Sequence, residues 1–151
     1  ILMRDDTYFS LGPESHFKCE KFVFQSKQDR QAIYQLLRGK LRSLFTVKAK
    51  ENDLVLRTPS ASMGIRGTEI LSDVYKIENE VKTDIALISA KLELDLSQVP
   101  GLPKDQASKI SLEPGQLFQG GRTLPGLGKS QVKSTVQMGR IYTFRFRQAL
   151  L

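Results

Sequence analysis

The stretch VLRTPSASMGIRGTEI, residues 55–70, decides the fold of this chain. It reads as an apolar strand, a Thr-Pro corner, a run of small residues and a tight Gly-x-x-Gly-Thr segment before a second apolar strand. Pro59 fixes its own φ and holds Thr58 extended. Gly64 and Gly67 allow a positive φ or a close approach of backbones. Because the stretch presents no catalytic group, we expect it to have a structural role.

Alternating apolar residues predict strands along most of the chain. Leu92, Leu94 and Leu96 alternate with Glu93 and Asp95, which is typical of a half-buried strand. Further short apolar or β-rich runs, separated by turn residues, cover residues 17–24, 46–50, 54–56 and 83–88. The sequence therefore predicts an all-β fold, either a jelly-roll-like β-sandwich or a short solenoid of mainly antiparallel strands.

The strand pattern is uncertain in one internal segment and incomplete at the N-terminal edge. Residues 28–38 offer a helical alternative, because Ile33, Leu36 and Leu37 would share one face of a helix. Residues 1–3 read as part of a strand, so we expect the N-terminal edge of the domain to be truncated.

The charge distribution divides the chain. The formal net charge is +7, and residues 119–151 hold no Asp or Glu. We expect residues 1–118 to form the β domain and residues 119–151 to be a basic linker or closing strand. A basic segment can contact an anionic envelope polymer, whereas nucleic acid is not expected as a partner. The cations available for such contacts are Arg122, Lys129, Lys133, Arg140, Arg145 and Arg147.

The composition argues against catalysis and against a bound metal or cofactor. The chain has one His and one Cys, so His16 and Cys19 cannot complete a zinc site of nitrogen and sulfur ligands. The residues 128–130, Gly-Lys-Ser, end like a phosphate-binding loop, but the first Gly of that motif is missing. Cys19 alternates with Phe17, which predicts a small buried hydrophobic residue rather than a reactive thiol.

Four ordered motifs resemble the FecR domain. Residues 58–70, TPSASMGIRGTEI, follow its pattern Thr-Pro-x-Ala-x-x-Gly-[VI]-Arg-Gly-Thr-x-[FI], while residues 4–15, 36–45 and 110–118 resemble its flanking turns and strands. The resemblance covers residues 1–118. The residues that carry the central and the closing motif are Thr58, Pro59, Ala61, Gly64, Arg66, Gly67, Thr68, Pro114 and Gly115.

One position departs from the family pattern. Where the family usually has a Gly after a strand, this chain has Ser89 and Ala90. A positive φ at Ala90 would be strained, so we expect a different turn there.

The resemblance implies a periplasmic module that relays the state of an outer-membrane receptor to a membrane-anchored anti-sigma regulator. It implies protein contact in the bacterial envelope, without catalysis. The alternative is a cell-envelope or surface scaffold domain that binds glycan or protein.

Within the domain, we expect Arg57, Arg66 and Thr68 to be structural determinants. Arg66 lies between two glycines, where its guanidinium would bind nearby carbonyls or a carboxylate. The competing interpretation is a surface Arg that is available to a partner.

Overall fold

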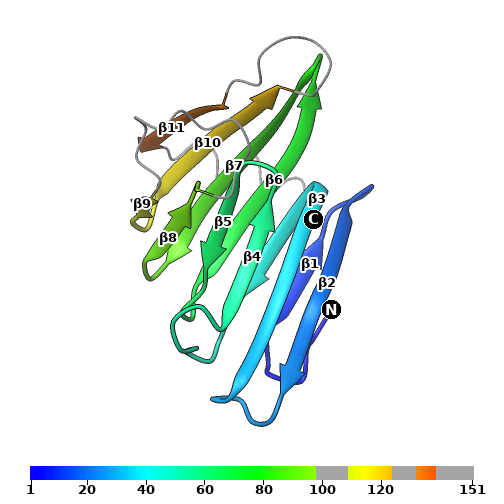
Figure 1. Cartoon of the computed structure of the whole chain (residues 1–151), viewed down its shortest axis with the longest axis vertical. Helices are drawn as coiled ribbons and strands as arrows, with labels where there is room; N and C mark the ends of the chain where they lie inside the picture. Colours follow the sequence, from blue (N-terminus) through cyan, green and yellow to red (C-terminus); the bar gives the residue numbers. More distant parts are fainter. Residues whose placement is uncertain (98–108, 124–131, 139–151) are drawn as a thin grey trace.

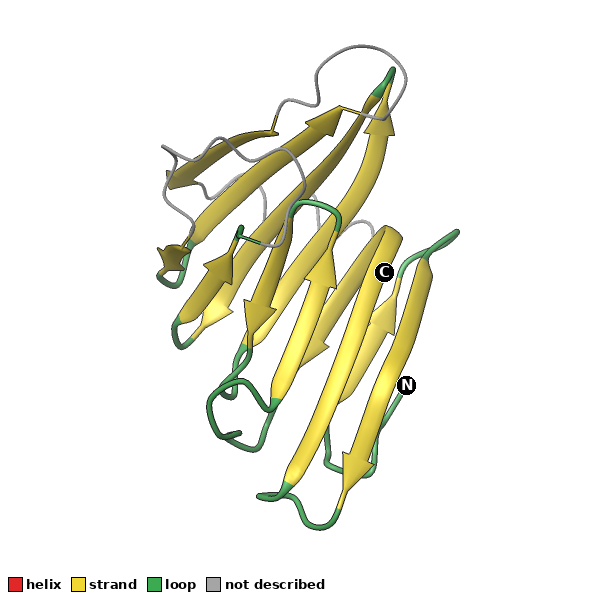
Figure 2. Ribbon diagram, in the orientation of Figure 1, coloured by secondary structure: helices red, strands yellow, loops and turns green. Residues whose placement is uncertain are grey.

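The computed structural model describes residues 1–97, 109–123 and 132–138 (Figure 1). These residues form strands and turns without a helix, which confirms the predicted all-β class (Figure 2). The strands are β1 (Tyr8–Leu11), β2 (His16–Phe24), β3 (Arg30–Leu44), β4 (Leu54–Thr58), β5 (Ala61–Gly64), β6 (Glu69–Ile77), β7 (Glu80–Ser89), β8 (Leu92–Asp95), β9 (Lys109–Leu112), β10 (Gln116–Thr123) and β11 (Val132–Met138).

The long strand β3 belongs to two sheets. Its second half joins sheet A, in the order β11-β10-β7-β6-β3-β1, and its first half joins sheet B, in the order β2-β3-β4-β5-β8-β9. β3 and β4 pair in parallel, and the other described pairs are antiparallel. In Figure 1, β4, β5 and β8 lie in front of β6 and β7. The mainly antiparallel strands of the sequence-based prediction are therefore present.

Gly39 marks the place where β3 passes from one sheet to the other. Its φ is +92°, a left-handed value that L-residues with a side chain rarely adopt. A Cβ atom at this position would overlap Ser15. The hydroxyl of Ser15 accepts a hydrogen bond from the backbone N–H of Lys40 at 3.0 Å. A glycine is thus needed both for the bend and for the close approach of the β1–β2 turn.

The core lies between the two sheets and contains an aromatic centre. The ring centroids of Phe9 and Tyr34 are 4.8 Å apart, and those of Phe9 and Phe45 are 5.8 Å apart. Around this centre pack fully buried aliphatic residues, among them Leu92 and Leu94 of β8. Leu96 is buried as well, so the alternation seen in the sequence places the three leucines correctly.

The helical alternative for residues 28–38 is wrong, because residues 30–38 lie in β3 and residues 28–29 in the bend before it. Ala32, Tyr34 and Leu36 are fully buried while Gln31 is exposed, which is the two-residue period of a strand. Residues 1–3 also differ from the expectation, since they contribute one isolated bridge between Leu2 and Tyr8.

The strand predicted for residues 46–50 does not form. The carbonyl of Val47 accepts a hydrogen bond from Nη2 of Arg30 at 2.7 Å instead of pairing with a neighbouring strand.

The prediction for Cys19 is wrong too, because this residue is exposed. It lies in β2, where the pairing register with β3 shifts between Cys19 and Lys21. The bulge interrupts the alternation on which the prediction of burial depended.

Candidate functional site

The central motif begins as a hairpin between β4 and β5. The Thr58 hydroxyl closes this hairpin, since it lies 3.2 Å from the backbone N–H of Ala61 and 3.1 Å from its carbonyl oxygen. Pro59 occupies the turn, where its fixed φ is favourable. Ser60 is fully buried, and its hydroxyl lies 3.2 Å from that of Thr83 on sheet A. The Thr-Pro corner therefore connects the two layers.

The second half of the motif returns the chain to sheet A. Gly67 has a φ of +84°, as the sequence suggested, and the carbonyl of Thr68 accepts a hydrogen bond from the N–H of Phe45 at 2.9 Å. Ile65 and Thr68 are 1% exposed. Gly64 differs, because its φ is not positive and a Cβ atom there would meet nothing within 4 Å. Gly67, and not Gly64, is the position where the backbone requires glycine.

Both arginines of this region form ion pairs at the surface. Nη2 of Arg66 lies 2.7 Å from Oε2 of Glu51, with the two side chains 60% and 71% exposed. Nη1 of Arg57 lies 3.3 Å from Oε2 of Glu20, and these two side chains are partly exposed as well. The carboxylate partner that the sequence suggested for Arg66 is present. Exposed pairs of this kind contribute about 0–1 kcal/mol to stability, so the geometry favours the surface interpretation of Arg66.

The closing motif is a tight turn between β9 and β10. Gly115 has a φ of +87°, and its N–H donates to the carbonyl of Leu87 on β7 at 2.9 Å. This turn lies next to the one at residue 90. The expectation of a different turn there is wrong, because Ala90 adopts a φ of +65°. The chain keeps the positive φ without the glycine and therefore carries backbone strain.

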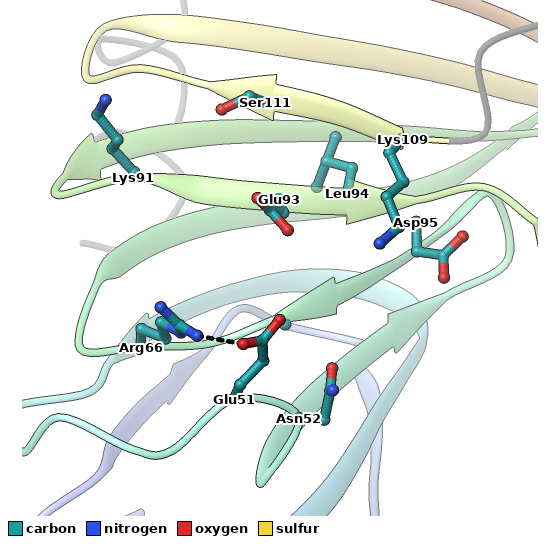
Figure 3. Close-up of a pocket in the computed structure, with 10 residues that line it drawn as sticks. Glu51, Asn52, Arg66, Lys91, Glu93, Leu94, Asp95, Lys109 and Ser111 are labelled. Carbon is teal, nitrogen blue, oxygen red and sulfur yellow. Dashed lines mark hydrogen bonds and ion pairs between the residues drawn. The ribbon is translucent and has the colours of Figure 1, made fainter.

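Beside the motif lies a cleft of about 430 Å³ over the outer face of sheet B (Figure 3). We call it the motif cleft. Three cations and three carboxylates face it, together with polar and small residues. Its lining consists of Glu51, Asn52, Gly64, Arg66, Lys91, Glu93, Leu94, Asp95, Lys109 and Ser111.

The chemistry of the motif cleft suits polar contacts. Hydrogen bonds from Ser97, together with the nearby Lys109, lower the pKa of Asp95, so this carboxylate is charged at neutral pH. The cleft has no His or Cys in its lining, and the described part of the chain holds no group of three residues that could bind a metal ion. Balanced charges of this kind provide specificity for a polar partner more than affinity.

A second cleft, of about 850 Å³, lies where β3 bends. We call it the bend cleft. Both apolar and charged residues line it, a mixture that many protein–protein interfaces share. Leu37 in it is 37% exposed, although it is a large apolar residue. The lining consists of Pro13, Glu14, Leu37, Arg38, Gly39, Lys40, Asp73, Val74, Tyr75, Lys76 and Val81.

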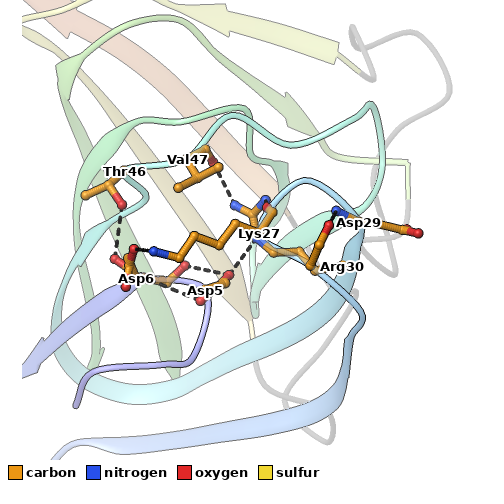
Figure 4. Close-up of polar contacts among 9 residues, drawn as sticks. Asp5, Asp6, Lys27, Asp29, Arg30, Thr46 and Val47 are labelled. Atoms are coloured by element: carbon orange, nitrogen blue, oxygen red, sulfur yellow. Dashed lines mark hydrogen bonds and ion pairs between the residues drawn. The ribbon is translucent and has the colours of Figure 1, made fainter.

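A buried ion pair holds the N-terminal turn, and the sequence analysis missed it (Figure 4). Nε of Arg30 donates to Oδ2 of Asp5 at 2.7 Å, and both side chains are at most 1% exposed. Asp5 also accepts hydrogen bonds from the N–H and hydroxyl of Thr7, at 3.1 and 2.9 Å. Arg30 donates further to the carbonyls of Lys27 and Val47. One guanidinium thus joins three loops at one end of the sandwich.

The described part of the basic segment belongs to sheet A. β10 runs across the boundary that the sequence suggested at residue 118, and β11 pairs with β10. Arg122 lies in β10 and Lys133 in β11, where Lys133 pairs with Gly121, the neighbour of Arg122. Lys129, Arg140, Arg145 and Arg147 lie outside the described residues.

The comparisons with known proteins agree with the motif geometry. The family model described as "FecR protein" matches residues 1–91, which include the complete Thr-Pro to Gly-Thr motif. The chain belongs to the FecR family. No curated protein matches it. Among the described residues of this FecR chain, no helix has both the length and the apolar character needed to span a bilayer.

Two solved structures share the fold. Both are of a proposed anti-sigma factor from Parabacteroides distasonis ATCC 8503, at 1.65 and 2.50 Å resolution. Each has a TM-score of 0.60 and 14% sequence identity to this FecR chain. The matches cover 96% and 95% of this chain, but 58% and 57% of the solved chains. The FecR chain therefore spans a little over half the length of these structures.

Proposed function

We propose that this chain is the extracytoplasmic part of an anti-sigma regulator of the bacterial envelope, and that it works as a non-catalytic binding and signalling module. The match to the FecR family over residues 1–91 carries the proposal. The solved structures with the same fold, described as a proposed anti-sigma factor, support it. In this role the chain relays the state of an outer-membrane receptor through protein contact.

The bend cleft is the surface we assign to the protein partner. Leu37 offers apolar area that a partner would bury, while the Arg38–Glu14 ion pair, 3.2 Å long, lies at the rim. The cleft also lies over the strand that both sheets share, so a partner seated there contacts both layers at once. A partner that binds one arrangement of the layers better than another shifts their populations, which is the physical basis of a relay.

The first experiment locates the native full-length protein by fractionation and external protease challenge. Membrane-attached protein with this domain cleaved only from the periplasmic side supports the relay. Soluble periplasmic or surface protein without a membrane span contradicts it.

A transcription reporter for the regulated sigma factor then tests the cleft. We expect Leu37→Glu to abolish the response to the inducing signal while the protein stays folded. Val23→Glu is the matched control, because Val23 is 45% exposed and lies outside the cleft. An equal loss of response in both variants, or in neither, contradicts the assignment of the bend cleft.

A second candidate function is an envelope scaffold that binds glycan or protein. The polar lining of the motif cleft favours it, since hydroxyls and repeated charges along a polymer match a cleft with both signs of charge. The basic residues Arg122 and Lys133 on adjacent strands are candidates for contact with an anionic polymer. Binding of purified envelope polymers that Lys109→Glu weakens would favour the scaffold over the relay.

A further inference from the structure

Strand β2 is an edge strand of sheet B, and none of the described strands pairs with its outer edge. In Figure 1 it is the outermost strand of the front layer. With nine residues it is the longest of the four described edge strands, since β1 and β9 have four residues each and β11 has seven. An edge of this length presents a row of backbone N–H and C=O groups that can pair with another strand.

Exposed apolar residues gather along this edge of the sandwich. Six large apolar residues are exposed in the described part of the chain. Two of them, Tyr8 and Val23, belong to β1 and β2 and are each 45% exposed. Two more, Ile1 and Leu2, belong to the segment that bonds to β1. A surface with several exposed large apolar residues is a candidate for contact with another protein.

A bulge divides β2 and determines which strand can pair with it. The register with β3 passes over Glu20, which is the extra residue. Phe17 before the bulge and Phe22 after it both pack against the core, so the inward positions change from odd to even numbers. A regular strand would match only one half of β2. A second β2 has the same extra residue and therefore matches both halves.

Two copies of β2 match when they pair antiparallel, with Glu20 of each copy opposite Lys21 of the other across a two-fold axis. In this register the two bulges face each other, and inward residues lie opposite inward residues. Because the axis is two-fold, each contact occurs twice. The remaining pairs are Phe17 opposite Phe24, Lys18 opposite Val23 and Cys19 opposite Phe22.

The charges of β2 favour this register. Lys21 donates to the side-chain oxygen of Gln31 at 2.9 Å and has no carboxylate partner in the described part of the chain. Glu20, which pairs with Arg57, keeps 28% of its side chain exposed. Opposite charges that face each other across antiparallel strands stabilise the pair, and like charges destabilise it. The register that would place Lys18 opposite Lys21 is therefore disfavoured.

We propose that the chain forms a symmetric dimer through antiparallel pairing of β2 with β2 of a second copy. Sheet B of one copy then continues into sheet B of the other, and neither β2 has a free edge. This goes beyond the proposed function, because it assigns the chain a partner of its own kind and uses neither cleft. Val23→Glu, the control for the bend cleft, places a carboxylate opposite Lys18 of the second copy and is compatible with the dimer.

Analytical ultracentrifugation measures the dimer, and charge reversal identifies the strand. We expect the unmodified chain to show a monomer–dimer equilibrium. Glu20→Lys and Lys21→Glu should each weaken self-association about tenfold or more, because each replaces two attractive contacts by two repulsive ones. An equimolar mixture of the two variants should associate again, since both cross-strand contacts then join opposite charges. Lys91→Glu is the matched control, because its exposed ion pair with Glu113 lies outside β2, and it should leave the dimer unchanged.

Three results of this experiment overturn the proposal. The first is an unmodified chain that stays monomeric at every concentration. The second is a dimer that both charge reversals leave as stable as the control does. The third is a mixture of the two variants that associates no better than either variant alone.

Disulfide trapping tests the register without changing the charges of Glu20 and Lys21. In a Cys19→Ser background, a chain with both Lys18→Cys and Val23→Cys should form intermolecular disulfides under mild oxidation. The chain with Val23→Cys alone should not, because the two copies of this position lie at opposite ends of the paired segment. Equal trapping of both chains, or of neither, overturns the proposal.

Discussion

The buried ion pair between Asp5 and Arg30 gives the sharpest prediction for stability. Arg30→Ala leaves the Asp5 carboxylate, which is fully buried, without its cation. It also removes the donor to the carbonyls of Lys27 and Val47. Asp5→Ala is the milder change, because the guanidinium keeps both carbonyl acceptors. We therefore expect Arg30→Ala to destabilise the fold more than Asp5→Ala does.

The expected size follows from burial. Removing one partner of a buried ion pair costs about 3–5 kcal/mol, out of a total free energy of unfolding of about 5–15 kcal/mol. For a chain of this length, that loss lowers Tm by about 6–20 °C. The hydrogen bonds from Thr7 to Asp5 remain in the Arg30→Ala variant and keep the cost near the lower end.

Urea and thermal unfolding followed by circular dichroism measure the effect. The double variant should be less destabilised than the sum of the two single variants, by at least about 1 kcal/mol, because neither charge is then left alone. Arg38→Ala is the matched control, since its ion pair with Glu14 is 69% and 80% exposed. A loss below about 1 kcal/mol for Arg30→Ala, equal to that of the control, would refute the reasoning.

Three further predictions concern single positions, each measured by urea unfolding. Gly39→Ala should cost at least about 1–3 kcal/mol, because it combines a left-handed φ with an overlap, whereas Gly64→Ala, in open space, should be close to neutral. Ala90→Gly should stabilise the fold by about 1 kcal/mol, by relieving a φ of +65°; an unchanged midpoint would show that no strain is stored there. Tyr34→Phe should raise the free energy of unfolding by about 1 kcal/mol, since the buried Tyr34 hydroxyl has no hydrogen-bond partner among the described residues. Burial raises the pKa of Tyr34, so the wild type should lose stability as the pH rises above about 10, where the unfolded phenol ionises, and the variant should lose less.

Local signals in the sequence were sufficient to predict the strands in which apolar and polar residues alternate, and the turns that need glycine. Leu92, Leu94 and Leu96 are buried as predicted, and Gly67 and Gly115 have the positive φ that their turns require. These features depend on neighbours a few residues away, which a single sequence displays directly.

Features that depend on distant partners could not be predicted. Asp5 and Arg30 are 25 residues apart, and nothing near either one signals the other. The exposure of Cys19 follows from a bulge against β3, and residues 46–50 pair with no strand in the described part of the chain. For the candidate site, the motif residues were recognisable, but the bend cleft depends on the change of sheet within β3, which the residues around Gly39 do not display.

The sharing of β3 between the sheets also sets how the molecule opens. Apart from Leu37, where the register with β2 shifts, the residues of β3 pair with β1, β2, β4 or β6, so this one strand holds both sheets together. Neither sheet can separate from the rest without breaking pairing to this strand. We expect amide hydrogen exchange in the two halves of β3 to proceed through one common, global opening, while the edge strand β2 exchanges earlier by local fraying.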